Sequence, residues 1–295
     1  MPVQPEAVFG LFSEKQAKNV IPAAMPELPE VETYRRFIDE TCLCQPIAEV
    51  EVQDPNRQLQ VDLDEFRRAL IGNQFTGTHR IGKQLFLETE KGVLVTMHFG
   101  MTGDVAYYRD AAETPRFARA VFLFQNGFRF AFVDSRKFGR LGLTQSVDEF
   151  RKQKKLGPDA LTLTAEELAK GLANKKAPIK PLLLDQRIAP GVGNWIADEV
   201  LFQARLHPER PANRLSAEEI DRLAAAIREV LETAVQAEAI YRDFPAHYLI
   251  HAREWDTAPA SPVAEAHLHC PHCQSRIEKE YVGGRATYFC PVCQV

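Results

Sequence analysis

Hydrophobic residues recur at near-helical spacing in the first part of the chain that shows a regular pattern. Val31, Tyr34, Phe37 and Ile38 repeat between residues 29 and 41, and charged side chains fill many of the positions around them. Apolar residues that recur every three or four positions form one face of an α-helix. The pattern therefore predicts one amphipathic helix over residues 29–41.

From about residue 47 to residue 145 the pattern becomes that of β-strands. Short apolar or alternating runs occupy Ile47–Val52, Gln84–Glu88, Val93–Phe99, Val121–Gln125 and Phe128–Val133. Asn-Gly separates the last two runs, and this dipeptide is the strongest short signal for a β-hairpin. Regularly spaced strands with turn residues between them are typical of an antiparallel sandwich or barrel. The first half is therefore predicted to be β-rich.

The remainder of the chain, from about Ser146, carries helix signals. A Ser or Thr followed three residues later by Glu forms a capping box, which opens a helix. Beyond the last of these boxes, an apolar stripe runs from Ile220 to Ala234 at helical spacing. The capping boxes occur at Ser146/Glu149, Thr164/Glu167 and Ser216/Glu219.

A glycine-bearing turn at residues 188–195 reads Ile-Ala-Pro-Gly-Val-Gly-Asn-Trp and leads into another helical segment. A glycine turn at the start of a helix can offer backbone N–H groups to a phosphate. Most glycine turns between helices only reverse the chain direction. The pattern alone leaves both interpretations open.

Four cysteines near the C-terminus form the most specific local pattern. Cys270-Pro-His-Cys273 and Cys290-Pro-Val-Cys293 are two CxxC pairs separated by 16 residues. This spacing is typical of four thiolates on one tetrahedral zinc ion, and an all-thiolate site is structural. Disulfides are the alternative, but the chain shows no export signal, which favours the metal. His269 and His272 are alternative ligands.

Composition narrows the class of protein only slightly. The chain has 295 residues, of which 45% are hydrophobic and 26% charged, as in globular proteins that bury a core. No apolar run reaches the length that spans a bilayer, so no membrane partner is expected. The formal net charge is −4, so a nucleic-acid surface would require local clustering of Lys and Arg. Cys42 and Cys44 are expected to be buried thiols.

The stretch that begins at Met25-Pro26 carries the most suggestive chemistry. Removal of the methionine would leave Pro26 with a free secondary amine, a nucleophile of the same kind as a Schiff-base lysine. The pKa of that amine would lie near the range of α-amino groups. Glu27 and Glu30 lie within one turn of it and could move protons for it. Alternatively, Pro26 and Pro29 only open a helix, because proline and acidic residues suit a first helical turn.

Residues 1–24 lack the apolar region of a secretory signal and the Arg-rich bias of a transit peptide. They are expected to be either a misassigned start upstream of Met25 or a disordered leader. If they stay attached, the nitrogen of Pro26 is a tertiary amide and cannot attack a substrate.

Six short motifs follow one another from Met25 to Val295. They are Pro26-Glu-Leu-Pro-Glu-Val-Glu32, Ile81-Gly-Lys83, His98-Phe-Gly-Met101-Thr-Gly103, Asp134-Ser-Arg136-Lys-Phe138-Gly139, Gly191-Val-Gly-Asn194, and the cysteine pairs with Gly284-Arg285. In this order they resemble the formamidopyrimidine-DNA glycosylase and endonuclease VIII family of base-excision repair enzymes. Leu28, where endonuclease VIII members usually have Gly, favours the formamidopyrimidine branch. Lys137 stands where Arg is commoner.

The resemblance implies an α+β fold. An N-terminal antiparallel β-sandwich with a helix would occupy residues 25–145, a helical helix-two-turn-helix module residues 146–265, and a zinc-finger hairpin with one structural Zn²⁺ residues 266–295. The implied activities are those of a DNA-formamidopyrimidine glycosylase and DNA-(apurinic or apyrimidinic site) lyase. The partner would be double-stranded DNA with damaged bases or abasic sites, whose damaged nucleotide is extruded. A monomer in the cytoplasm is expected, associated with the nucleoid if the protein is bacterial.

The resemblance also implies roles for individual residues. The Pro26 amine would attack C1′ of the damaged nucleotide, expelling the base and forming a Schiff base that permits β- and δ-elimination. Glu27 would protonate the sugar ring oxygen and relay protons, with Glu30 in support. Phosphate contacts are expected from Lys83, Lys180, Asn194 and Arg285, with His98 also near the DNA. Met101, Arg136 and Phe138 would fill the space left in the duplex and contact the orphaned base.

Several of these residues also have a purely structural interpretation. Lys83 and Lys180 could be solvated surface charges, His98 a satisfied histidine on the sheet, and Met101 and Phe138 core residues. The whole chain could also be a non-catalytic DNA-lesion-binding protein if residues 1–24 remain attached. In a third interpretation, the zinc finger is a protein-interaction ribbon on an unrelated β domain, against which the ordered motifs argue.

The segment between Ala237 and His269 departs from the family pattern. Bacterial members that excise 8-oxoguanine usually carry a longer loop here, rich in Gly and Thr, whereas this segment lacks glycine. It resembles the shortened version of plant and some other members. We therefore expect weak excision of 8-oxoguanine and better activity on formamidopyrimidines, hydantoins or abasic sites.

Overall fold

A computed structural model describes residues 25–253 and 268–295. The expectations for residues 1–24 lie outside this range, as does the part of the loop prediction that falls on residues 254–267. The chain divides into two compact units. Among the described residues, the first contains Met25, Pro26 and Val31–Lys154, and the second contains Glu27–Glu30, Lys155–Arg253 and residues 268–295.

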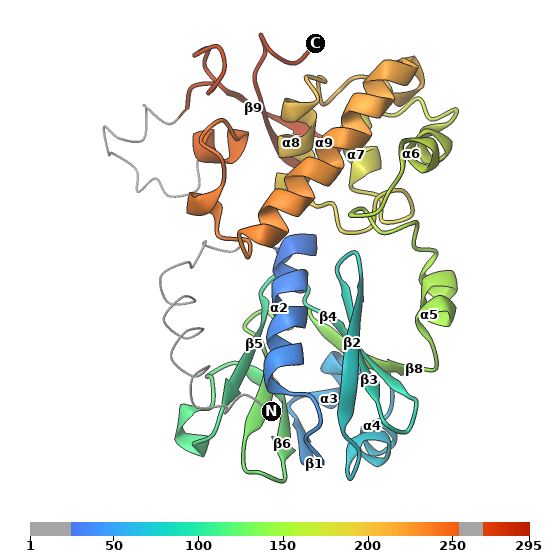
Figure 1. Cartoon of the computed structure of the whole chain (residues 1–295), viewed down its shortest axis with the longest axis vertical. Coiled ribbons are helices and arrows are strands. Elements are labelled where there is room, and N and C mark those ends of the chain that lie inside the picture. The colour runs from blue at the N-terminus through green and yellow to red at the C-terminus, as the bar shows by residue number, and fades with distance from the viewer. Residues whose placement is uncertain (1–24, 254–267) are drawn as a thin grey trace. The chain divides into compact units, whose positions relative to one another are not determined.

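Two four-stranded antiparallel sheets form the framework of the first unit (Figure 1). One sheet has the order β1-β6-β7-β5 and the other the order β2-β3-β4-β8. The strands of the first sheet are β1 (Ile47–Val52), β6 (Ala118–Phe124), β7 (Arg129–Asp134) and β5 (Gly103–Tyr108). Those of the second are β2 (Phe75–Ile81), β3 (Gln84–Thr89), β4 (Leu94–His98) and β8 (Arg140–Thr144). The predicted antiparallel architecture is confirmed.

One apolar core joins both sheets to the first helix. Helix α2 (Leu28–Thr41) contributes Val31, Phe37 and Ile38, which are buried among apolar side chains of both sheets. The amphipathic pattern therefore predicted this helix and its buried face correctly. The unit also contains α3 (Pro55–Gln58), α4 (Leu63–Leu70), η2 (Ala111–Glu113) and α5 (Val147–Lys154).

The strand predictions were correct where apolar residues dominate and incomplete elsewhere. The hairpin around Asn126-Gly127 joins β6 and β7, and Gly127 adopts the positive φ of 86° that its turn requires. Strands β2, β5 and β8 were missed. Each contains a glycine and polar residues, so its apolar periodicity is weak, and the neighbouring strands supply the order.

The second unit is helical with one β-hairpin. Capping boxes at Thr164 and Ser216 start two of its helices as predicted, with both reciprocal hydrogen bonds present. At Ser146, in the first unit, the Glu149 backbone N–H donates to the Ser146 hydroxyl, and α5 starts at the next residue. The elements are α6 (Ala165–Leu172), α7 (Ile179–Leu183), α8 (Asn194–Gln203), η3 (Ala212–Arg214), α9 (Ala217–Gln236), η4 (Tyr241–Asp243), η5 (Leu249–Ala252), β9 (Glu278–Val282) and β10 (Arg285–Phe289).

Helix α8 is the centre of the second unit and is buried along nearly its whole length. It packs against α9, the long helix beside it, and against β10 (Figure 1). Because α8 is buried, polar groups at its start and along its length must find partners inside the protein. Those partners form the candidate site. None of the helices in residues 25–253 and 268–295 is both long and apolar enough to cross a membrane.

Candidate functional site

The carboxylate of Glu27 lies at the N-terminus of helix α8. Its side chain is only 3% exposed. Its Oε1 accepts a hydrogen bond from the Trp195 backbone N–H at 3.1 Å, and its Oε2 accepts one from the Ile196 N–H at 3.4 Å. The first N–H groups of a helix have no partner within the helix, and its dipole stabilises an anion there. Glu27, which is 168 residues away from Trp195 in sequence, therefore acts as the cap of α8.

The glycine turn before α8 makes room for this carboxylate. A Cβ atom on Gly193 would lie 2.1 Å from Cδ of Glu27, so any other residue at this position would displace the carboxylate from the helix N-terminus. Gly191 adopts a positive φ of 107°, and its N–H donates to the Gln186 side chain at 2.9 Å. The suggestion that the turn offers backbone N–H groups to a phosphate is therefore corrected for Trp195 and Ile196, whose N–H groups bind Glu27.

Glu30 and Tyr241 complete the surroundings of Glu27. The backbone N–H of Glu27 donates to Oε2 of Glu30 at 3.0 Å, and the Tyr241 hydroxyl donates to Oε1 of Glu30 at 2.6 Å. Pro26, which immediately precedes Glu27, lies before the first residue of α2 and is buried. The structure thus places the Glu30 carboxylate beside Glu27, the residue that follows Pro26. Tyr241 was missed by the sequence analysis because nothing in its neighbourhood in sequence points to a carboxylate.

A buried group of charges, here called the Asp198 cluster, consists of Lys180, Asp198 and Arg253. The Lys180 ammonium lies 2.6 Å from Oδ1 of Asp198, and the Arg253 guanidinium lies 3.3 Å from Oδ2. The side chains are 0%, 1% and 6% exposed, respectively. Burial lowers the pKa of Lys180 and raises that of Asp198, while the opposite charge of each partner works against both shifts.

The surroundings of Lys180 argue against the phosphate contact expected of it. Its ammonium also donates to the Thr287 hydroxyl at 2.8 Å and to the Ala286 carbonyl at 2.9 Å. With Asp198, these acceptors match the three hydrogens of an ammonium group. Lys180 is therefore neither a solvated surface charge nor a donor directed to solvent, and it holds strand β10 in place.

Arg285 stands at the tip of the β9–β10 hairpin. Val282 pairs with Arg285 across a two-residue turn, Gly283-Gly284, in which both glycines have positive φ. Such a turn favours glycine because side chains disfavour this conformation. The base of the strand is held by Lys180 and by the Asn194 amide, which donates to the Ala286 carbonyl at 2.9 Å. Arg285 itself is exposed, which is compatible with the predicted phosphate contact.

The four cysteines of the two CxxC pairs come together at the end of this hairpin that lies opposite its turn. Their Sγ atoms all lie within 4.8 Å of one another, with 3.8 Å between those of Cys270 and Cys293 and 3.5 Å between those of Cys273 and Cys290. Thiolates at a tetrahedral metal with 2.3 Å bonds lie about 3.8 Å apart. The group can therefore hold a metal ion. His269 and His272 are not part of it.

The other two cysteines differ from each other. Cys42 is buried, and burial raises its pKa to about 12, whereas Cys44 is exposed. The expectation that both thiols are buried was therefore wrong for Cys44. Cys44 follows the end of α2 and has a positive φ of 58°, so it lies in a surface turn.

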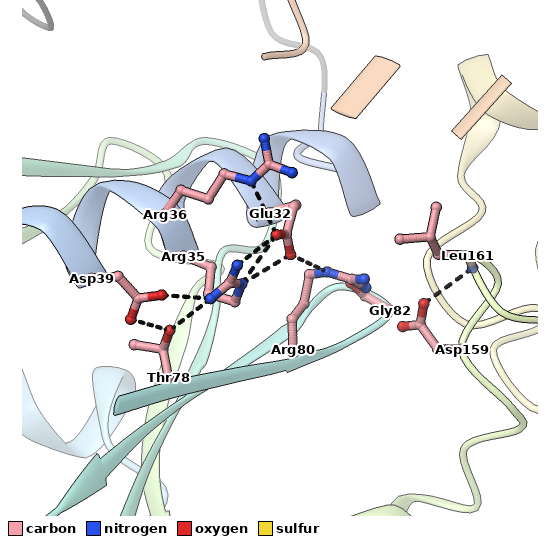
Figure 2. A network of polar contacts seen from close by, with 9 residues as sticks. All are labelled: Glu32, Arg35, Arg36, Asp39, Thr78, Arg80, Gly82, Asp159 and Leu161. Carbon is pink, nitrogen blue, oxygen red and sulfur yellow. Dashed lines mark hydrogen bonds and ion pairs between the residues drawn. The ribbon is translucent and has the colours of Figure 1, made fainter. Parts of the chain in front are cut away.

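In the first unit, a second charged group surrounds Glu32 and is called the Glu32 cluster. It consists of Glu32, Arg35, Arg36 and Arg80 (Figure 2). Arg35 and Arg80 donate to Glu32 at 2.8 Å and 3.0 Å, and Arg36 does so at 3.3 Å. Burial alone would raise the pKa of Glu32, but the hydrogen bonds and charges of Arg35 and Arg80 outweigh it and lower that pKa.

The Glu32 cluster continues into the turn that carries Lys83. Strands β2 and β3 pair Ile81 with Gln84, so Gly82-Lys83 is the two-residue turn between them. Arg80 donates from Nη1 to the Gly82 carbonyl at 3.1 Å, and Gly82 has a positive φ of 56°. The network in Figure 2 therefore connects α2 to Gly82, the residue before Lys83 in the chain. Glu32 lies in the first of the six motifs, but no role was predicted for it from the sequence.

A single buried carboxylate joins the two loops expected to enter the duplex. Asp134 is 0% exposed and accepts from the Thr102 hydroxyl at 2.5 Å, the Arg136 N–H at 3.1 Å and the Gly139 N–H at 2.7 Å. These donors come from the loop of Met101 and from the loop of Arg136 and Phe138. Asp134 was also missed as a functional position, although it lies in a quoted motif.

The side chains carried by these loops are accessible. Phe138 is 43% exposed, and the Arg136 guanidinium lies over its ring at 5.1 Å. Met101 is half-buried. Because Phe138 lies at the surface, its interpretation as a core residue is wrong.

His98 is the last residue of strand β4, and its imidazole is neutral. Its Nδ1 accepts a hydrogen bond from the Gly100 N–H at 3.1 Å. Burial lowers its pKa to about 4, and the positive charges of Lys83, Arg140 and Lys154 contribute to the same shift. A neutral imidazole whose Nδ1 accepts can donate from Nε2. The alternative prediction, a histidine satisfied by contacts within the protein, therefore holds at Nδ1, while Nε2–H can donate to a ligand.

Comparison with known sequences and structures covers nearly the whole chain. The profile of the formamidopyrimidine-DNA glycosylase N-terminal domain matches residues 25–141, and that of the formamidopyrimidine-DNA glycosylase H2TH domain matches residues 156–244. A formamidopyrimidine-DNA glycosylase of Thermus thermophilus is 38% identical over 92% of this chain and 98% of its own length. Another, of Arabidopsis thaliana, is 35% identical over 92% of this chain and 71% of its own length.

Solved structures give the same result. Lactococcus lactis formamidopyrimidine-DNA glycosylase, bound non-covalently to DNA containing an AP site, matches with a TM-score of 0.80 and 28% sequence identity. The match covers 91% of this chain and 99% of that one. MutM in complex with DNA containing carbocyclic 8-oxo-G matches with a TM-score of 0.78 and 28% identity over 92% of this chain and all of that one.

Proposed function

The chain belongs to the formamidopyrimidine-DNA glycosylase family, and on that premise we propose that it is a bifunctional DNA glycosylase and AP lyase of base-excision repair. Its substrate is double-stranded DNA with oxidised bases or abasic sites. The observation that carries this proposal is the position of Glu27. The residue after Pro26 is held at the N-terminus of a buried helix, beside a glycine whose missing side chain leaves room for its carboxylate.

In this mechanism the secondary amine of Pro26 attacks C1′ of the damaged nucleotide. The C1′–base bond breaks, the base leaves with its electron pair and a proton, and ring opening gives a Schiff base between Pro26 and C1′. Loss of a proton from C2′ then permits β-elimination, and δ-elimination removes the sugar. Each step moves a proton near Pro26, so a nearby carboxylate is needed.

Glu27 is the proposed proton relay. Two backbone N–H groups hold its carboxylate, so its orientation does not depend on the substrate. The carboxylate can take a proton and deliver it to the sugar ring oxygen. Glu30 supports the site by binding the Glu27 N–H.

The phosphates next to the extruded nucleotide are proposed to contact Lys83, Arg285 and Asn194, with the Nε2–H of His98 as a further donor. Arg285 offers a planar guanidinium at the end of a short, stiff turn, which suits a two-pronged phosphate contact. The four thiolates of Cys270, Cys273, Cys290 and Cys293 fit a structural zinc ion, which would stiffen the hairpin and supply no catalytic position.

Met101, Arg136 and Phe138 are proposed to fill the space that the extruded nucleotide leaves. An exposed aromatic ring replaces lost stacking, and a guanidinium binds an unpaired base edge. Asp134 keeps the loops that carry these side chains together. The weak 8-oxoguanine excision expected from the segment after Ala237 stays a prediction.

The decisive test is borohydride trapping on a duplex with an abasic site, using chains that start at Met1 and at Met25. The mature N-terminus of each form is determined by mass spectrometry. We expect trapping by the Met25 form, from which the methionine is removed, because only a free Pro26 amine can form a reducible Schiff base.

Pro26→Gly, which keeps an N-terminal amine, and acetylation of the N-terminus are the controls for the trapping experiment. Acetylation should abolish trapping, and Pro26→Gly should retain part of it. If neither form traps while DNA binding is intact, the chain is a DNA-lesion-binding protein and the proposed activity is wrong.

A further inference from the structure

Tyr241 belongs to the second unit and contacts the surroundings of Glu27, although the two residues are far apart in the sequence. Its hydroxyl donates to Oε1 of Glu30 at 2.6 Å, a contact between residues 211 positions apart. Burial, together with the Glu30 and Glu27 carboxylates, raises the pKa of Tyr241 well above its usual value of 10. The hydroxyl therefore keeps its hydrogen at all working pH values and acts as the donor.

The contacts of Tyr241 close a ring around Glu27. From Tyr241 the ring passes through Glu30 to the Glu27 N–H at 3.0 Å, and from the Glu27 carboxylate to the Trp195 N–H at 3.1 Å. It returns from the Trp195 indole to Tyr241, whose rings meet edge-to-face at 5.3 Å. Glu27 is thus held at its backbone and at its carboxylate by the same set of contacts.

The backbone before Tyr241 adopts an unfavourable conformation. Glu238 and Ala239 both have positive φ, 51° and 58°, which costs free energy in residues that carry a Cβ atom. These residues follow α9, and the Ala239 N–H donates to the Ala234 carbonyl at 2.8 Å. Strained backbone persists only where surrounding contacts determine it. Here the two strained residues lie two and three positions before Tyr241, which binds Glu30.

We propose that Tyr241 is a positioning residue for the reaction at Pro26, acting through Glu30 to fix the backbone of Glu27. This inference rests on the proposed function. A short hydrogen bond from a phenol to a carboxylate restrains the rotation of Glu30. Because Glu30 binds the N–H of Glu27, the same restraint reaches the peptide next to the nucleophile. Misplacement of a nucleophile by even 1 Å is costly for rate.

The test compares Tyr241→Phe, Glu30→Gln and the double variant, each made in the form of the chain that traps the abasic site. Tyr241→Phe keeps the ring between Trp195 and Phe244 and removes only the hydroxyl. We expect the single-turnover rate to fall about tenfold and binding of a reduced abasic-site duplex to stay within about twofold. In the Glu30→Gln background, the same substitution should change the rate less than about twofold, because its route of action is already broken.

Tyr107→Phe is the matched control. It also removes one tyrosine hydroxyl that binds a side chain, Gln45, at 3.0 Å, and its ring is also packed against another, that of Phe128. It lies on the sheet of the first unit, away from any proposed site residue, and its single-turnover rate should equal that of the parent chain. An equal loss of rate from Tyr241→Phe with and without Glu30→Gln would overturn the proposal.

A second measurement does not depend on activity. Hydrogen exchange of the Glu27 backbone amide, followed by NMR, should accelerate about tenfold in Tyr241→Phe and no further in the double variant. Unchanged exchange would overturn the proposal even in an active enzyme. If the parent chain neither traps nor cleaves, the proposed function fails, and the exchange experiment still decides whether Tyr241 fixes Glu27 through Glu30.

Discussion

The Glu32 cluster and the Asp198 cluster have the same arrangement of charges, and each binds the backbone at a different β-hairpin turn. Each places arginine or lysine side chains around the carboxylate of one buried residue. Through Arg80, the Glu32 cluster binds the carbonyl of Gly82, next to Lys83. Through Lys180, the Asp198 cluster binds the carbonyl of Ala286, next to Arg285. In both units, a buried carboxylate therefore fixes the backbone beside a proposed phosphate-binding residue.

The clusters differ in how far water reaches their cations. In the Glu32 cluster, Arg36 is 46% and Arg35 25% exposed, so solvent screens part of each charge. In the Asp198 cluster, Lys180 is completely buried. Charges interact more strongly away from water, but each then depends on its partner, because an unpaired buried charge is unfavourable. The comparison predicts unequal consequences for the loss of the two carboxylates.

The largest effect is expected from Asp198→Asn. The substitution removes the buried carboxylate that Lys180 and Arg253 share, and breaking such a group costs about 3–5 kcal/mol in free energy of unfolding. Urea unfolding measures it, followed by tryptophan fluorescence, to which Trp195 in the same unit contributes. Asp243→Asn is the control, because its carboxylate is 54% exposed and pairs with an exposed Arg242. A similar loss in both variants would show that the buried cluster has no special role.

A smaller effect is expected from protonation of His98. This residue sharpens the comparison because burial is the main cause of its shifted pKa, and no counter-charge is involved. Its folded pKa of about 4 lies below the ordinary value of 6.5. The unfolded chain therefore binds the proton more readily, and stability falls as the pH is lowered from about 6.5 to about 4. The loss amounts to at most about 3 kcal/mol. In His98→Gln, this part of the pH dependence should disappear from urea unfolding curves, and an unchanged curve would contradict it.

The smallest effect is expected from Glu32→Gln, with a loss of about 1–2 kcal/mol at pH 7. The pKa of Glu32 is lowered in the folded protein, so its contribution is complete above its ordinary value of 4.5 and fades as the pH falls through the folded pKa. The difference between the parent chain and the variant should accordingly vanish in acid. Unfolding of the first unit, followed by circular dichroism at several pH values, measures it. A loss larger than that of Asp198→Asn would reverse the comparison.

Much of the site could be predicted because it consists of short patterns with a local physical cause. The spacing of the four cysteines sets the geometry of a metal site, and the capping boxes at Thr164 and Ser216 satisfy N–H groups three residues away. Glu27 and Glu30 follow Pro26 within one turn. For such features the partners are close in sequence, and the spacing alone brings them together.

Other features were decided by tertiary structure. Lys180 looked like a surface cation until the fold buried it against Asp198 and strand β10, and Tyr241 had no visible partner until it met Glu30. The N–H groups of α8 looked available for a phosphate, although a carboxylate 168 residues away binds them. In each case the partner comes from a distant segment, and burial changes which interactions a polar group needs. The sequence determined which residues could do the chemistry, and the packing of distant segments decided which of them hold the others in place.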